Sequence, residues 1–196
     1  MKKLCTIFAV LALLSYSAQA QSTVRVDGGG SDLAYEKGTT IFDAGIGFGN
    51  AYGGYYAWGG LGGGVPISAS LELGLHDYFS VGPYAAFASY SYRYVGSGYR
   101  ATFFSVGAKG SFHYVPLIND ALDLSIDAER VDLYVSVYLG GEFYSDNDDN
   151  NYDNRAGADF GTVVGGRYMF NPKIGAYTEI GYAALAVWTI GVTLNL

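Results

Sequence analysis

The chain has 196 residues, of which 50% are hydrophobic and 29 are glycine, and 18 acidic side chains against 11 basic ones give a formal net charge of −7. This acidity argues against a nucleic-acid partner, because phosphate contacts need clustered Lys and Arg. A single cysteine, Cys5, excludes an internal disulfide.

The first 20 residues have the three parts of a secretory signal peptide. Residues 2–3 are lysines, 7–14 are apolar, and 18–20 (AQA) form a small-x-small cleavage site. The apolar run is shorter than the roughly 20 residues that a membrane-spanning helix needs. We therefore predict a cleaved signal peptide over residues 1–20. Cys5 precedes the apolar run, so no lipid anchor is expected.

Alternation of apolar with small or polar residues, the period of a β-strand with two different faces, recurs along the rest of the chain. It is clearest at the C-terminus, where every second residue from Trp188 to Leu196 is apolar. In chain order, the predicted strands cover residues 42–48, 67–75, 79 to about 90, 104–113, 131–143, 160–170, 174–182 and 188–196. Eight strands are therefore expected.

The charged residues of these strands share the face that carries Gly, Ser and Tyr. They are Asp43, Glu72, Lys109, Asp132, Glu142, Arg167 and Glu179. In a soluble sandwich or ligand-binding barrel, charges occupy the exposed face, whereas in lipid the exposed face is apolar and charges turn inward. Every backbone group in lipid must be paired, so the sheet must close. The sequence predicts an all-β fold, an eight-stranded antiparallel transmembrane β-barrel over residues 40–196, after an unstructured periplasmic lead-in over 21–39.

The predicted connections differ in length. Tight turns fall at 77–78 and 171–173, and long loops at 50–66, about 91–100 and 145–159. In such barrels long loops face outside and short turns face the periplasm, which puts both termini on the periplasmic side. The connection 115–130 is long although it should be periplasmic, and we expect a short helix over 117–124.

Three stretches carry a resemblance to a known family: 80–84 (SVGPY), 165–172 (GGRYMFNP) and 179–182 (EIGY), followed by the alternating C-terminus. Over residues 40–196 the chain resembles the outer-membrane β-barrel domain family, whose small members are often labelled porin family and are similar to OmpA/OmpX-type barrels. The resemblance implies a bacterial outer-membrane location among outer-membrane lipids, and insertion by the outer-membrane assembly machinery. Leu196 departs from the aromatic residue that is common at the family's C-terminus.

The inward charges are predicted to form a polar network in the lumen. Arg167 and Glu179 flank the turn at 171–173 and are expected to lie within reach of each other, with Asp43, Glu72 and Lys109 in the same layer. The network is either a gate or ion path, or a paired filling of an interior that has just enough room for side chains. Because an unpaired buried charge is costly, the paired filling is favoured.

Aromatic residues near the predicted strand ends on the apolar face are expected at the two lipid headgroup levels. The predicted lipid-interface aromatics are Phe42, Phe48, Phe112, Tyr114, Tyr168, Phe170 and Trp188. The aromatic tract 52–58 is interpreted as interfacial residues in a mobile turn, with a ligand-contacting loop as the alternative.

We predict no catalytic residue, no cofactor and no metal site. His76 and His113, the only histidines, are expected near the periplasmic rim, and no serine stands in an evident triad with them. The acidic segment 146–153 begins like a calcium loop but lacks Gly at position 6 and Glu at position 12, so a solvated surface loop is favoured over weak calcium binding.

Two functions fit these patterns. The favoured one is a non-enzymatic outer-membrane protein with a structural or surface-interaction role and a lumen plugged by polar side chains. The alternative is a narrow porin-like channel for small solutes. A closed barrel has no free edge that demands a partner, so a monomer is expected. The sequence indicates no particular external ligand.

Overall fold

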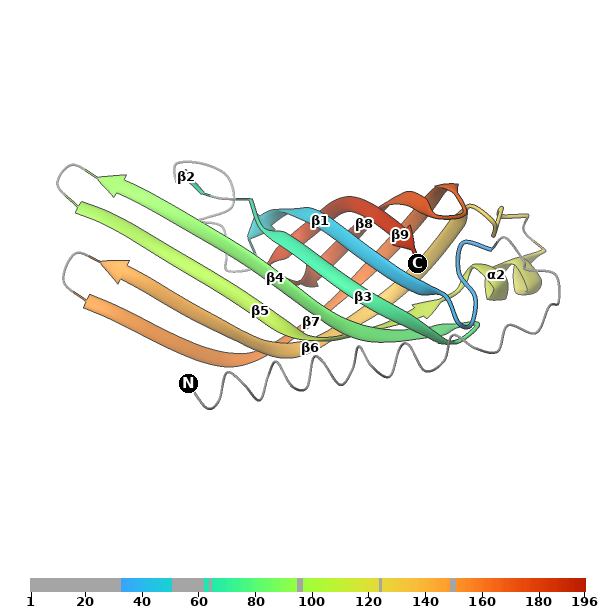
Figure 1. The fold of residues 1–196 in the computed structure, drawn as a ribbon, viewed down its shortest axis with the longest axis horizontal. Helices are drawn as coiled ribbons and strands as arrows, with labels where there is room; N and C mark the ends of the chain where they lie inside the picture. The colour runs from blue at the N-terminus through green and yellow to red at the C-terminus, as the bar shows by residue number, and fades with distance from the viewer. Residues whose placement is uncertain (1–32, 51–61, 64, 95–96, 124, 149–150) are drawn as a thin grey trace. The chain divides into compact units, whose positions relative to one another are not determined.

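The computed structural model describes residues 33–50, 62–63, 65–94, 97–123, 125–148 and 151–196. The predicted signal peptide, most of the lead-in and the aromatic tract 52–58 lie outside the described residues. The strands are β1 (Thr40–Asn50), β2 (Gly62–Gly63), β3 (Ile67–His76), β4 (Phe79–Tyr94), β5 (Ser97–His113), β6 (Val131–Asp148), β7 (Asn151–Asn171), β8 (Ile174–Ala183) and β9 (Ala186–Asn195), and the helix is α2 (Val115–Leu122) (Figure 1).

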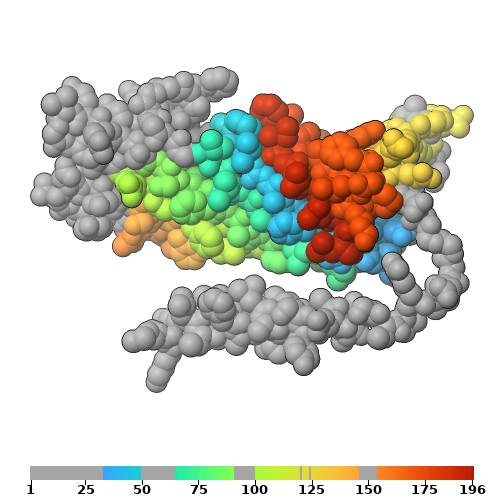
Figure 2. All heavy atoms as spheres, turned by 45° about the horizontal axis from the view of Figure 1, so that its top comes forward, coloured from blue at the N-terminus to red at the C-terminus, as the bar shows by residue number. Residues whose placement is uncertain are grey.

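Eight long strands close into an antiparallel barrel. Their order is β4-β3-β1-β9-β8-β7-β6-β5, and β5 pairs with β4 to complete the ring. The two-residue β2 pairs with β4 beyond the end of β3. The first and last strands are neighbours, paired from Ile41↔Asn195 to Asn50↔Ala186, and their blue and red surfaces lie side by side in Figure 2. The predicted eight-stranded antiparallel barrel is confirmed.

The two ends of the barrel are built differently. The α2 end carries the turns at 77–78 and 172–173, the helix α2 and the C-terminus, and the hairpin end carries the β4–β5 and β6–β7 connections (Figure 1). At the α2 end the predicted tight turns are present. The chain therefore returns to the α2 end after every second strand of the ring.

The two faces of the barrel wall differ as the alternation predicts. On β6, Leu139 is 57% exposed outside and the adjacent Tyr138 is 4% exposed inside. On β5, Phe104 and Val106 are exposed while Ser105 between them is buried. The wall is thus apolar outside, which is the reverse of the arrangement that water favours.

The interior changes character along the barrel. Toward the hairpin end it is filled by aromatic residues and alanines, namely Tyr84, Ala86, Ala88, Tyr90, Ala101, Phe103 and Tyr138, joined by Val163 and the 183–185 turn. Toward the α2 end most buried residues are polar or charged, among them Lys109, Asp132 and Arg167, and a few, such as Ile41 and Met169, are apolar.

The predictions of long loops at 91–100 and 145–159 are wrong. β4 and β5 stay paired as far as Tyr94↔Ser97, and β6 and β7 as far as Asp148↔Asn151. Among the described outward positions of these extensions, Ser145, Asn154, Ala156 and Ala158 are polar or small, so the apolar alternation fades while backbone pairing continues. A strand of this kind carries no pattern that separates it from a loop.

The long connection at the α2 end contains the expected short helix, α2, which begins two residues earlier than predicted. Pro116 lies in its first turn, where a missing N–H leaves no bond unmade. The helix ends at Leu122, and the following C-cap residue, Asp123, adopts the left-handed conformation with φ 50°. In the described part of the chain, no helix is long and apolar enough to cross a membrane.

Residues 34–39, predicted to be unstructured, instead cross the α2 end of the barrel; we call them the N-terminal strap. Gly38 donates its N–H to the Gly74 carbonyl (2.9 Å), and Ala34 donates to the Ala128 carbonyl (2.9 Å). Ala34 and Tyr35 are 2% and 5% exposed. The Gly- and Asp-rich composition around the strap indicates disorder, but backbone bonds and one buried tyrosine fix it.

Candidate functional site

Six of the seven predicted lumen residues lie together toward the α2 end, and we call them the lumen cluster. They are Asp43 on β1, Glu72 on β3, Lys109 on β5, Asp132 on β6, Arg167 on β7 and Glu179 on β8. Each is 5% exposed or less. Inward positions of six strands converge on one place because an eight-stranded barrel is narrow enough for side chains to meet across it.

Arg167 joins three carboxylates. Its Nη2 atom lies 2.7 Å from Asp43 Oδ2 and 2.6 Å from Glu72 Oε1, and its Nη1 atom lies 2.8 Å from Asp132 Oδ2. The guanidinium carbon lies 4.1 Å from the centre of the Tyr134 ring. The planar fork of Arg suits such multiple carboxylate contacts, and the aromatic face adds a further favourable contact.

Lys109 is the second cation of the lumen cluster. Its Nζ atom lies 2.7 Å from Glu179 Oε1, 3.0 Å from Glu72 Oε1 and 3.6 Å from Asp43 Oδ2. Lys109 and Arg167 therefore share Glu72 and Asp43. This sharing makes the lumen cluster one connected network rather than separate ion pairs.

Arg167 and Glu179 take the expected diagonal positions on β7 and β8, but each side chain binds other partners. Glu179 binds Lys109 and accepts hydrogen bonds from the hydroxyls of Tyr134 (3.0 Å) and Tyr138 (2.8 Å). Across the β7–β8 pair, Arg167 lies two positions from the residue opposite Glu179. Its side chain extends across the lumen to β1 and β3 instead.

His113 connects to the lumen cluster through hydrogen bonds that sequence reasoning missed. Its Nδ1 lies 2.9 Å from Asp132 Oδ1, and its Nε2 lies 2.9 Å from Ser80 Oγ. These bonds follow the order of a serine-hydrolase triad. However, Ser80 donates its only hydroxyl proton to Glu72 Oε2 (2.7 Å), whereas a serine nucleophile must donate to histidine. Ser80 and His113 are also 4% and 0% exposed, so the arrangement is suited to filling the core rather than to catalysis.

Tyr35 of the N-terminal strap covers this end of the network. Its ring stacks on the His113 ring with centroids 3.4 Å apart and planes 9° apart, and its hydroxyl donates to the His76 carbonyl (2.7 Å). Burial, with the nearby carboxylates of Asp132 and Glu72, raises the pKa of the Tyr35 phenol well above its ordinary value. His76 itself is exposed at the rim, while His113 is buried inside.

Glu142 is the predicted lumen residue that stays outside the lumen cluster. It lies farther along β6, opposite Ser105 of β5, and is partly exposed. A separate group of polar contacts forms at this level: Asp159 accepts hydrogen bonds from Ser105 and from the Tyr84 hydroxyl (3.1 Å). The alternation correctly predicted that Glu142 occupies an inward position, but Glu142 lies too far along the barrel axis from Arg167 to join the lumen cluster.

The predicted lipid-interface aromatics that belong to strands occupy outward positions at two levels, and Tyr114 lies between β5 and α2. Phe48, Tyr168, Phe170 and Trp188 are 41–63% exposed, and Phe42, Phe112 and Tyr114 are half-buried. Phe48 packs on Trp188 with ring centroids 5.2 Å apart. Phe112 packs on Phe79 at 5.0 Å, next to the α2 end.

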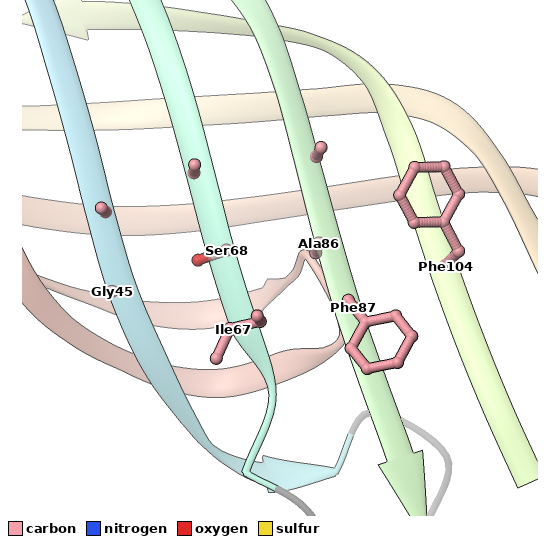
Figure 3. Close-up of a pocket in the computed structure, with 9 residues that line it drawn as sticks. Gly45, Ile67, Ser68, Ala86, Phe87 and Phe104 are labelled. Carbon is pink, nitrogen blue, oxygen red and sulfur yellow. The ribbon is translucent and has the colours of Figure 1, made fainter.

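A shallow groove of about 340 Å³ interrupts the wall where small residues of neighbouring strands lie side by side. Ala44 pairs with Ala69 and Ala69 pairs with Ala85. The exposed side chains of the lining come from β3, β4 and β5, namely Ile67, Phe87 and Phe104 (Figure 3). Apart from Ser68, the groove is lined by apolar residues and glycine.

The expectations about metal ions concern residues that are described only in part. The side chains of 146–153 lie outside the described residues, although the backbone of 146–148 belongs to β6 and that of 151–153 to β7, where a loop was expected. Within the described side chains, no group of three or more His, Cys, Asp and Glu is arranged to hold a metal ion.

The sequence matches no protein-family model and no curated protein. Among solved structures, the fold is similar to the N-terminal β-barrel domain of OprF from Pseudomonas aeruginosa, with 15% identity, a TM-score of 0.47, and coverage of 83% of this chain and 100% of that chain. It is also similar to Ail, the attachment invasion locus protein of Yersinia pestis, with 14% identity, a TM-score of 0.44, and coverage of 81% and 95%. A second Ail structure, in complex with the heparin analogue sucrose octasulfate, gives 15% identity, a TM-score of 0.45, and the same coverage.

Proposed function

We propose that this chain is a non-enzymatic integral protein of a bacterial outer membrane, with a structural or surface-interaction role and a lumen closed by its own side chains. The observation that carries the proposal is the inverted barrel wall. Outward positions from Phe104 to Phe112 on β5, and from Val131 to Phe143 on β6, are all apolar or glycine. A continuous apolar exterior around a closed barrel suits lipid, and soluble monomers rarely expose apolar patches of this extent.

Export and orientation complete the proposal. Residues 1–20 act as a cleaved signal peptide, the outer-membrane assembly machinery inserts the barrel, and the barrel stays a monomer. The α2 end faces the periplasm and the hairpin end faces outside, as the short turns of the α2 end favour. The paired extensions of β4–β5 and β6–β7 then present a sheet to the surroundings of the cell, which supports a surface-interaction role.

The closed lumen is supported by the lumen cluster and by the aromatic layer above it. Buried, paired side chains from six strands occupy the cross-section near Arg167, and Tyr35 covers its α2 side. An ion that crosses this layer has to break several charge-assisted hydrogen bonds in a dry interior. We expect no steady conductance from the protein in a planar bilayer, whereas a steady ion current would support the narrow porin-like channel instead.

Location and orientation are tested together in cells. The expected result is that unboiled protein from the outer-membrane fraction migrates differently from boiled protein on a denaturing gel. In a Cys5→Ser background, a membrane-impermeant maleimide should label Asn154→Cys in intact cells, while Glu129→Cys, which is equally exposed but at the α2 end, should stay unlabelled. A soluble protein without a gel shift would refute the membrane location, and the reverse labelling would refute the orientation.

A further inference from the structure

The helix α2 exposes large apolar side chains at the α2 end of the barrel. Leu117 is 47% exposed and Leu122 is 65% exposed. Among the described residues outside the strands, the other exposed large apolar side chains are Val65 and Leu196. The two leucines are thus a concentration of apolar surface in a connection that a periplasmic location would leave in water.

The apolar side chains of α2 form one face. At about 100° per residue, positions 117, 118, 121 and 122 span an arc of roughly 140°. Leu117, Ala121 and Leu122 are exposed and Ile118 is half-buried. Asn119 is directed to its own loop, where it donates to the Ile126 carbonyl (2.9 Å) and accepts from the Ile126 N–H (3.1 Å). The polar side chain of Asn119 therefore bonds within the connection, while the apolar arc of the helix is exposed. The barrel wall likewise has polar residues inside and apolar residues outside.

The start of α2 lies next to the apolar exterior of the barrel. The helix begins two residues after the end of β5, where the outward Phe112 ring lies 5.0 Å from Phe79 and 6.4 Å from Tyr78. These rings form the aromatic border of the wall at the α2 end, and aromatic residues at such a border favour the headgroup level of a bilayer. A helix that follows the border directly starts at headgroup depth.

Charge indicates which contact holds the helix. The last turn of α2 contains no basic residue and its first turn contains no acidic one. Attraction to anionic headgroups needs Lys or Arg near the surface, so it contributes little here. Apolar burial in the boundary between headgroups and acyl chains is left as the source of affinity.

We propose that α2 is an interfacial helix whose Leu117–Leu122 face inserts into the phospholipid leaflet at the α2 end of the barrel. This inference rests on the proposed membrane location. The helix then fixes the depth of the barrel on its periplasmic side, much as the aromatic residues do on the wall.

The test uses single cysteines, because Cys5 is the only native one. In a Cys5→Ser background, an environment-sensitive dye is attached at Leu122→Cys in protein that is reconstituted into zwitterionic phospholipid vesicles. Glu129→Cys, exposed in the same connection, is the aqueous control, and Leu139→Cys, exposed on the wall, is the lipid control. We expect about threefold weaker quenching by aqueous iodide at position 122 than at 129, together with quenching by spin labels placed near the headgroups. Raising the salt concentration should not release the helix.

The outcomes separate the two proposals. Iodide quenching at position 122 as strong as at 129, with position 139 protected, would overturn the interfacial helix and leave the membrane barrel standing. Strong iodide quenching at 139 as well would overturn both. Because the dye is itself apolar, Leu117→Asp is added in the Leu122→Cys background: the proposal expects this change to return the dye to water, and an unchanged dye signal would count against it.

Discussion

Replacing Arg167 with methionine tests whether the lumen cluster stabilises the barrel. The change removes the cation that lies within 2.8 Å of carboxylate oxygens of Asp43, Glu72 and Asp132, and it leaves a shorter, uncharged side chain. Lys109 still contacts Glu72 at 3.0 Å and His113 still contacts Asp132 at 2.9 Å, whereas Asp43 is left with Lys109 at 3.6 Å and therefore loses most. Removing one partner of a buried ion pair typically costs about 3–5 kcal/mol.

The assay is urea unfolding in lipid vesicles, followed by tryptophan emission and by the folded band on unboiled gels. In a thermal melt of the same samples, a loss of this size would lower the midpoint temperature by roughly 6–20 °C, because each kcal/mol corresponds to about 2–4 °C in a chain of this length. Arg130→Met is the matched control, because the Arg130 side chain is 60% exposed and its nearest carboxylate, on Asp127, is 3.9 Å away; little change is expected there.

A second substitution identifies the cause of the loss. If the destabilisation comes from uncompensated carboxylates, Asp43→Asn should recover part of it in the Arg167→Met background, because one unpaired charge is removed. Wild-type stability in Arg167→Met would refute the reasoning altogether. A loss that Asp43→Asn does not reduce would assign the stabilisation to packing of the guanidinium on Tyr134 instead.

Three further predictions concern packing and the N-terminal strap. Gly165→Ala should destabilise the barrel by about 1–3 kcal/mol in the same urea assay, because a Cβ there would lie 2.4 Å from Tyr134 ring atoms, whereas Gly157→Ala, with no atom within 4 Å, should be neutral. Tyr35→Phe keeps the stacked ring but loses the hydrogen bond to the His76 carbonyl. The free energy that protects the amides of residues 34–39 from hydrogen exchange should fall by roughly 1 kcal/mol, so that their exchange is faster. Unchanged exchange would contradict the role of that bond. Because folding raises the pKa of the Tyr35 phenol, the neutral phenol contributes its full stability to the folded strap below the ordinary pKa of about 10, and this stability is lost as the pH rises through the folded-state pKa. Amide exchange of the N-terminal strap should therefore increase at alkaline pH more in the wild type than in Tyr35→Phe.

The barrel itself could be predicted because most positions of its wall follow one rule, apolar outside and small or polar inside. The proposed lipid surroundings and the narrow interior require opposite chemistry on alternate residues, so the sequence alone indicates which faces Leu139 and Tyr138 occupy. The rule ends where the strands extend beyond the apolar wall. Asn154 of β7 is exposed and lies opposite Ser145 of β6, and this pairing depends on backbone bonds that leave no periodic trace in side-chain polarity.

The N-terminal strap shows a different limit. Its backbone bonds go to Gly74 and Ala128, and its one anchor, Tyr35, stacks on His113. None of these partners is near it in the chain, and none has a residue type that announces the contact. A short segment that is held mainly by distant backbone groups can have the same composition as a disordered segment. Its position is therefore fixed only when the barrel end that it binds has formed.

The sequence predicts which residues of the lumen cluster face inward, but it does not predict which of them pair with each other. A period of two fixes which side a residue occupies, and it leaves the register between strands open to any even shift. In the register that forms, Asp132 lies directly opposite Arg167 and Glu142 lies opposite Gly157. A shift of two residues would preserve every inward and outward assignment and still give Arg167 a different partner. The contacts of Ser80 with Glu72 and His113 depend on two such registers at once. The residues of a barrel interior are therefore readable from alternation, whereas the network that they form is a property of strand pairing.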